Sequence, residues 1–342
     1  MKSFRHAAGV DAGKSSFVLA IRTLDDDPII KSKSFKNTRD GADKALAFVV
    51  AFGADPAQTL LCVEHVGVYA EKLCYYLQEK TGMVFMADPE HVHRSMKDRR
   101  LKTDKMDAIR IAHYGVRFTD FVRPFKLKNP LVERIEALLQ LRRATVKERT
   151  RYKNQLKSLR HKWSVPAEAE MRLQAMIDLV SKHISDIELE IQSLIKTDSM
   201  MAQGVSILKS MPGVGLILAT AMLVLTNGFE DLPSYRQASS YLGMAPKPYE
   251  SGESVRRPSR SRGDGHSMMR QLLYLSARSL ITARTEARSY FARKVQMGKP
   301  KTLVLNNLGN KQLKVMLALL RTWKPYDENY RSINPSFALT KP

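Results

Sequence analysis

The sequence predicts three consecutive regions: a mixed α/β domain, a long helical segment and a mostly α domain. Residues 6–35 have the patterns of three strands, and residues 60–117 alternate short apolar strands with helical repeats, which favours a mixed sheet. Residues 130–197 have helical periodicity, and every apolar repeat after them is helical. We therefore expect domains at residues 1–128, 129–197 and 198–342.

The elements of the first domain follow from local patterns. Strands are expected at 6–12, 16–23 and 28–35, with a tight turn at Ala12-Gly13-Lys14 between the first two. Helical spacing then appears at 39–52 and 68–80, alternating with apolar strands at 60–66 and 83–87. A further helix is expected over 104–117, with Thr103 as its N-cap.

The middle region begins with a strongly basic helical stretch. Between Arg142 and Lys162 there are nine Lys or Arg residues and one acid, Glu148. A charge run of this kind is usually a solvated helix face. This run is too one-sided for ion pairs within the helix, so a polyanion partner is the better interpretation. The residues expected to contact nucleic acid here are Arg142, Arg143, Arg149, Lys153 and Lys157.

Pro166 interrupts the helix, and a heptad seam follows it. The apolar seam positions alternate in steps of four and three: Leu173, Ile177, Val180, Ile184, Ile187, Ile191 and Leu194. This spacing predicts a coiled coil that assembles a homo-oligomer, a dimer or a tetramer. The alternative is a helix that packs within its own chain.

Composition indicates the class of partner. The chain has 342 residues, a formal net charge of +22 and a pI of about 10.0. A chain this basic most often binds nucleic acid; the alternative is a ribosome-like protein or one that binds polyanions without specificity. Cys62 and Cys74 lack disulfide or metal spacing, which fits a reducing cytoplasm. We expect no signal peptide and no membrane span.

Four acidic residues stand at positions where a sheet and a helix can bring them together. Asp11 and Glu64 end apolar strands, whereas Asp104 and Asp107 lie three residues apart at a helix start and share one face. Such a cluster repels itself unless a hard cation neutralises it. Mg²⁺ suits all-oxygen ligands and leaves positions for phosphate and water.

A serine near the chain's second arginine cluster is the candidate nucleophile. Ser251 lies in Tyr249-Glu250-Ser251-Gly252, just before an expected loop that contains Arg256, Arg257, Arg260 and Arg262. These arginines can neutralise a phosphate and its transition state. By chemistry alone, Ser254, Ser259 and Ser261 compete with Ser251.

The Met211-Pro212-Gly213-Val214-Gly215 segment precedes an apolar helix. Gly213 and Gly215 would let backbone N–H groups approach a phosphate at the helix N-terminus, without reading bases. A plain tight turn is the alternative.

These motifs together resemble one family. Val10-Asp11-Ala12-Gly13-Lys14, Glu64-His65-Val66-Gly67 and Thr103-Asp104-Lys105-Met106-Asp107 look like the DEDD tetrad of RuvC-type nucleases. With Tyr241-Leu242-Gly243-Met244-Ala245-Pro246 and the serine motif, they resemble insertion-sequence transposases related to the Piv DNA invertases. His65 and Val66 depart from the family's usual Ala-Thr.

The resemblance implies a RuvC-like RNase H fold, a coiled coil, and a helical transposase domain with a nucleophilic serine. By motif, the catalytic residues are Asp11, Glu64, Asp104, Asp107 and Ser251, and the four acids hold Mg²⁺. Expected partners are double-stranded donor and target DNA and a bridge-type guide RNA. The expected location is the bacterial cytoplasm, in association with the nucleoid.

The expected activity is recombination through a phosphoserine intermediate. A site-specific DNA invertase with the same chemistry is the nearest alternative. A metal-dependent junction nuclease that activates water is the second, and a non-catalytic nucleic-acid-binding protein is the third. A covalent protein–DNA adduct separates a recombinase from a nuclease.

Overall fold

The structure is a computed structural model that describes residues 4–25, 27–64, 67–95, 103–251, 255–261 and 265–330. Within residues 247–251 and 255–260 it describes the backbone alone. The chain divides into two compact units, Met1–Leu127 and Lys128–Pro342. No helix in the described ranges combines the length and the apolar character needed to cross a membrane.

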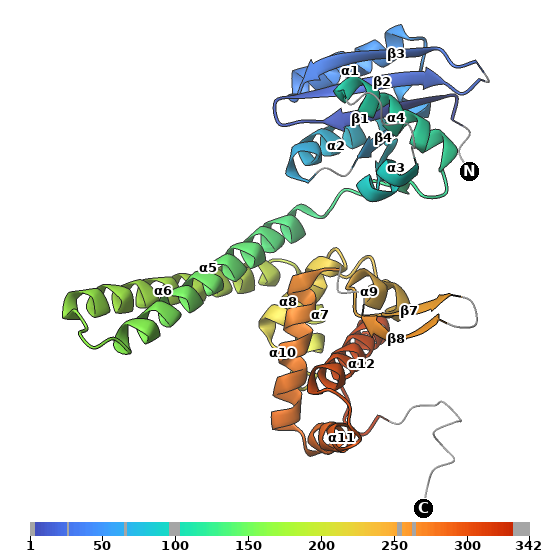
Figure 1. Ribbon diagram of the computed structural model, residues 1–342. Coiled ribbons are helices and arrows are strands. Elements are labelled where there is room, and N and C mark those ends of the chain that lie inside the picture. The colour runs from blue at the N-terminus through green and yellow to red at the C-terminus, as the bar shows by residue number, and fades with distance from the viewer. Residues whose placement is uncertain are drawn as a thin grey trace, which may run out of the picture. The chain divides into compact units, whose positions relative to one another are not determined.

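The first unit is built on a six-stranded mixed sheet with the order β3-β2-β1-β4-β5-β6 (Figure 1). β1 pairs antiparallel with β2 and parallel with β4, so both kinds of pairing meet at the centre of the sheet. The mixed α/β class expected from the sequence is confirmed. The strands are His6–Ala12 (β1), Ser16–Thr23 (β2), Ile30–Lys36 (β3), Thr59–Glu64 (β4), Val84–Ala87 (β5) and Arg123–Pro124 (β6).

Helices cover both faces of this sheet. Alternate residues of β1 and β2 pack against helix α1, Arg39–Ala51, and helix α2, Val68–Thr81. The opposite face carries helix α4, Asp104–Arg117, which lies directly on Gly9. A Cβ at Gly9 would lie 2.1 Å from the Ala108 carbonyl oxygen, so the absence of a side chain sets this close approach. A short 3-10 turn, Pro56–Gln58 (η1), and helix α3, Pro89–Ser95, complete the unit.

The second unit is mostly helical, as expected. Two long helices, Pro130–Arg160 (α5) and Ala167–Lys196 (α6), pack side by side as a hairpin (Figure 1). The start of α5 and the end of α6 contribute to a hydrophobic core that they share with the later helices. The later elements are Ser199–Lys209 (α7), Leu216–Leu225 (α8), Tyr235–Tyr241 (α9), Pro246–Ser251 (β7), Val255–Ser261 (β8), Ser267–Ala283 (α10), Thr285–Gln296 (α11) and Lys301–Thr322 (α12).

The heptad seam of α6 is occupied within the chain. Ile177, Ile184 and Ile191 are at most 5% exposed in the single chain. The facing apolar residues come from α5. Self-association through this seam, which the sequence favours, is contradicted by the packing of α5 on it. A heptad pattern indicates an apolar partner without showing which chain supplies it. An oligomer formed through other surfaces stays a prediction.

Two further expectations concern local structure. The segment from Arg256 was expected to be a loop, whereas its backbone forms strand β8 paired with β7. Cys62 and Cys74 are free and buried, and burial raises the pKa of each thiol to about 12. Both thiols are therefore protonated and unreactive at neutral pH.

Candidate active site

The first two carboxylates lie at the ends of adjacent parallel strands. β1 and β4 are in register from His6↔Thr59 to Val10↔Val63, so Asp11 and Glu64 occupy the next register positions, side by side. Gly9, two residues before Asp11, contacts α4, and Cys62, two residues before Glu64, packs with α4 residues. Because side chains alternate along a strand, both carboxylates are directed to the face that α4 covers.

The other two carboxylates begin α4. The Thr103 hydroxyl accepts a hydrogen bond from the Met106 N–H and caps the helix, as the sequence predicts. Asp104 and Asp107 lie in the first turn, where negative charge is favoured by the helix dipole. Asp107 also accepts a 2.8 Å hydrogen bond from Arg110, which the sequence analysis missed. The spacing of three residues between an Asp and an Arg on one helix could have predicted this pair.

Like charges from α4 act on the two strand carboxylates. Burial raises the pKa of Asp11, and the charges of Asp104 and Asp107 raise it further. Burial also raises the pKa of Glu64, with added contributions from Asp11 and Asp107. Asp11 and Glu64 are therefore each subject to the negative charge of acids that begin α4, and these like charges oppose each other.

The donor set fits a hard divalent cation. All four side chains offer oxygen, and the two most buried already bear the electrostatic cost that a cation would relieve. In the described part of the chain no three His, Cys, Asp or Glu side chains are spaced as a ready-made metal cage. To coordinate a cation together, the four side chains would have to rearrange, and water would supply the remaining ligands.

Ser251 is the last residue of β7. It pairs with Val255 across an antiparallel ladder, so the three-residue connection between the strands begins immediately after it. Gly252 and Ser254 lie outside the described residues. The hairpin extends from the helices of the second unit, to which Ser251 belongs (Figure 1). The carboxylates belong to the first unit.

The hairpin register places arginines opposite the serine strand. Glu250 pairs with Arg256 and Tyr249 with Arg257, and after a register shift Lys247 pairs with Arg260. Arg262 lies outside the described residues. The two-stranded ladder thus concentrates three arginine positions on the strand that neighbours Ser251.

The glycine turn between α7 and α8 is held from inside the unit. Gly213 has a φ of +81°, and its carbonyl accepts a 2.5 Å hydrogen bond from Ser276, which itself accepts one from Gln312. Gly215 is exposed at the start of α8 and supplies no side-chain cap. Ser276 and Gln312 were not predicted, because residues remote in sequence give no local signal of a shared turn.

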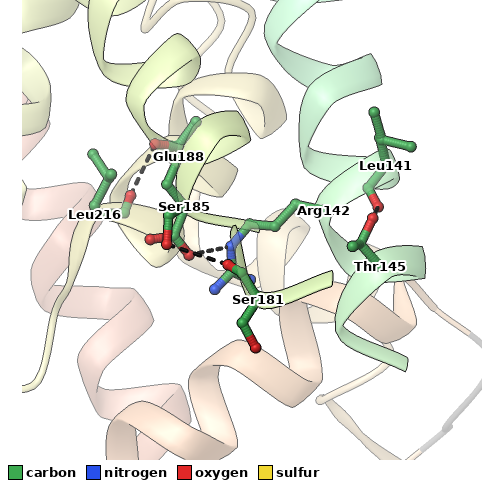
Figure 2. A network of polar contacts seen from close by, with 8 residues as sticks. Leu141, Arg142, Thr145, Ser181, Ser185, Glu188 and Leu216 are labelled. Carbon is green, nitrogen blue, oxygen red and sulfur yellow. Dashed lines mark hydrogen bonds and ion pairs between the residues drawn. The ribbon is translucent and has the colours of Figure 1, made fainter. Parts of the chain in front are cut away.

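The basic run of α5 divides into two parts. Arg142 donates a 2.6 Å hydrogen bond to Glu188 of α6, as Figure 2 shows, and Arg143 donates to Ser267 of α10. Acids on α6 therefore neutralise part of a run that the sequence suggested was unpaired. Both residues were expected to contact nucleic acid, and the structure gives each an intramolecular partner.

Farther along α5, cations remain open to solvent. Lys153 and Lys157 are exposed and form no ion pair among the described residues, and Arg149 is half-buried one turn earlier. Lys153 and Lys157 line a groove of about 670 Å³ between α5 and α6. Of the five basic residues expected to bind nucleic acid on this helix, these three keep that capacity.

Comparison with known proteins identifies related sequences over most of the chain. Residues 8–160 match a family described as a transposase of the DEDD type from IS110 elements. Residues 205–292 match a second family, described as transposase IS116/IS110/IS902.

Individual relatives match at low identity. A pilin gene-inverting protein of Moraxella lacunata is 25% identical over 94% of this chain and 97% of its own length. The transposase of insertion sequence element IS1111A from Coxiella burnetii is 23% identical, over 70% of this chain and 72% of its own. An insertion element IS110 protein of Streptomyces coelicolor is 28% identical over 45% of this chain and 37% of its own length.

Among solved structures, Thermus thermophilus RuvC in complex with a Holliday junction substrate is similar at 14% identity and a TM-score of 0.26. The match covers 35% of this chain and 99% of RuvC.

Proposed function

We propose that this chain, a member of the IS110 family of transposases, cuts and rejoins DNA strands with Ser251 as nucleophile. The observation that carries the proposal is the placement of two carboxylates at adjacent strand ends on the α4 face and two at the start of α4, in a chain whose serine ends a strand beside arginine positions. Transposase or recombinase activity follows from the family. The serine chemistry, the metal and the guide are our proposals.

Each step of the proposed reaction breaks one P–O ester bond and forms another. The Ser251 Oγ attacks the scissile phosphorus, an Oγ–P bond forms, and the P–O bond to the leaving strand breaks. The serine proton passes to a carboxylate or to water, and the leaving oxygen accepts a proton. A hydroxyl of the second strand then attacks the phosphoserine and restores the serine. The exchange therefore needs no ATP.

The carboxylates and arginines have separate roles in this scheme. Asp11, Glu64, Asp104 and Asp107 would hold Mg²⁺, which would supply positive charge to a phosphate and to a leaving oxygen. Arg256, Arg257, Arg260 and Arg262 would bind the phosphate oxygens. Gly213 and Gly215 at the start of α8, and Lys153 and Lys157 on α5, would position the backbone without reading sequence.

Assembly and target choice complete the proposal. Two DNA segments must be present together, which favours a dimer or tetramer, and the exposed apolar residues of α6, Met176, Leu179 and Leu189, offer a surface for it. A structured guide RNA, implied by the family resemblance, would select the donor and target DNA.

A second candidate, DNA inversion, rests on one observation. The match to the pilin gene-inverting protein spans nearly the full length of both chains. Inversion and transposition share the same strand chemistry and differ in the arrangement of the sites. Recombination on plasmids that carry paired sites in direct or inverted orientation distinguishes the two.

Substitution of the serine tests the proposal. Ser251→Ala should abolish covalent protein–DNA adduct on denaturing gels, because it removes the attacking oxygen, and should leave DNA binding intact. Ser259→Ala and Ser261→Ala, on the paired strand, are the matched controls and should still form adduct. Adduct formation by Ser251→Ala, or cleavage by the wild-type chain without any adduct, would favour the water-activating nuclease.

A further inference from the structure

A second charged cluster lies on the α4 face of the first unit, and its centre is buried. Arg22, the next-to-last residue of β2, is 8% exposed. Its Nε donates to the carbonyl of Thr23 at 3.0 Å, and its Nη1 lies 2.6 Å from Nδ1 of His113 on α4. Arg117, one turn after His113, is exposed at the end of the same helix.

This cluster lacks a negative partner within the part of the chain that the structure describes. A buried guanidinium is normally paired with a carboxylate, because removal of its charge from water is costly. Here burial lowers the pKa of Arg22, and the charge of Arg117 lowers it further. Burial, then Arg22 and Arg117, also lower the pKa of His113. The cluster therefore contains two guanidinium groups and an imidazole whose protonation is disfavoured.

Local structure explains only part of this arrangement. A cation in the last turn of α4 stabilises the helix dipole, which accounts for Arg117. It does not account for Arg22, which is buried beside a second positive charge. Asp25 and Asp27 occupy the turn after β2, and neither forms an ion pair with the described cations. The cluster has the composition of an anion site.

The hydrogen-bond donors suit a tetrahedral anion. Because Arg22 Nη1 donates to His113 Nδ1, the imidazole carries its proton on Nε2 and can donate it. Guanidinium groups bind phosphate oxygens in pairs. Arg117 is exposed to solvent at the end of α4, where a strand can reach it.

The cluster lies at the opposite end of α4 from the carboxylates. Arg22 pairs with Ala7 at the start of β1, whereas Asp11 pairs with Val18 at its end. α4 runs from Asp104 to Arg117, which corresponds to roughly 20 Å along the helix axis. That span is about six phosphates of one strand of B-form DNA at about 3.4 Å of rise each.

We propose that Arg22, His113 and Arg117 bind a backbone phosphate of the nucleic acid that the carboxylates process, one helix length away from them. The inference rests on the proposed function for the nature of the strand. It adds a contact in the first unit that fixes where along the strand the carboxylates lie.

Binding measured without cleavage tests the inference. The affinity of the full-length chain for duplex DNA and for single-stranded RNA would be measured by fluorescence anisotropy in EDTA, over a range of salt concentrations. Arg117→Ala should weaken binding about tenfold and reduce the slope of log K against log salt by roughly 0.9, the loss of one phosphate contact. Lys44→Ala on α1 removes one exposed charge from the opposite face and should change neither quantity.

A substitution of the buried arginine and a measurement with inorganic phosphate complete the test. Arg22→Gln, checked for an unchanged circular dichroism spectrum, should match Arg117→Ala. Loss of affinity for duplex DNA supports the inference, whereas a loss confined to RNA would overturn it and assign the cluster to an RNA partner. If both variants bind both nucleic acids as the wild-type chain does, the inference is overturned. If inorganic phosphate then stabilises the folded wild-type chain but neither variant, the site is assigned to a free anion. A wild-type chain that binds neither nucleic acid would contradict the proposed function itself.

Discussion

The two units place their chemistry in opposite structural settings. Two carboxylates of the first unit lie at strand ends of a six-stranded sheet, half-buried among like charges, and two begin the helix that packs tightly on it. The serine of the second unit ends a strand of a two-stranded hairpin. The fold therefore holds the acids in its core at a cost in stability, whereas it presents the serine at the end of a strand in a separate two-stranded sheet.

Neutralising one acid should give the largest effect. Asp11→Asn should reduce DNA cleavage by a factor of about 10³ or more, because the cation loses a ligand and charge. Without Mg²⁺ the variant should melt roughly 2–5 °C higher than the wild-type chain, since a repulsive charge is gone. Thermal unfolding with and without Mg²⁺ and a cleavage assay measure both effects.

The control for this comparison is on the serine hairpin. Ser251→Ala should also abolish strand exchange but should leave the melting temperature, and the increase in it caused by Mg²⁺, unchanged. Equal cleavage by Asp11→Asn and wild type would remove the carboxylates from the mechanism. A melting temperature for Asp11→Asn below that of the wild-type chain would contradict the claim that the carboxylates destabilise the fold.

A matched pair of glycines tests how tightly the first site is fixed. Gly9→Ala places a Cβ about 2.1 Å from the backbone of α4, so it should destabilise the first unit by roughly 1–3 kcal/mol. Gly215→Ala in the second unit meets no atom within 4 Å and should cost only a few tenths of a kcal/mol to ~1 kcal/mol. Urea unfolding measures both. Equal losses would show that α4 can move away from the sheet.

Substitutions in the heptad seam of α6 test whether the seam supports the fold of one chain or contacts between chains. Ile184→Asp with Ile187→Asp places charge where α5 packs, and burying unpaired carboxylates costs several kcal/mol in order of magnitude. We expect the hairpin to open, seen as a loss of helical circular dichroism. Leu189→Asp, at an exposed α6 position, should keep the helix content. Dissociation of an oligomer by the double variant with full helix content would instead assign the seam to contacts between chains.

The smallest effect is a pH dependence confined to the first site. The pKa values of Asp11 and Glu64 are raised in the folded chain, so the folded state binds more protons than the unfolded state. The unfolding free energy they contribute therefore falls as pH rises from about 4 through their folded pKa values. In EDTA, the stability advantage of Asp11→Asn over wild type should grow from acidic to neutral pH. An advantage independent of pH would indicate that charge is not its cause.

Local patterns predicted the elements that position the acids. Alternating apolar strands placed Asp11 and Glu64 at strand ends, and Thr103 capped the helix that begins at Asp104. The partner of the α6 seam could not be predicted, because a heptad pattern fits any apolar helix. Nor could the Arg142–Glu188 pair, since residues 46 apart share no local repeat. Strand β8 was missed because its arginines and Pro258 have little strand propensity.

The most direct test of the account is the identity of the residue joined to DNA. Wild-type chain trapped on a cleavage substrate would be digested with nuclease and protease, and the nucleotide-bearing peptide sequenced by mass spectrometry. The account predicts a phosphodiester on Ser251 that forms only with the four carboxylates intact. A nucleotide on any other residue, or efficient cleavage without a linked peptide, would contradict it.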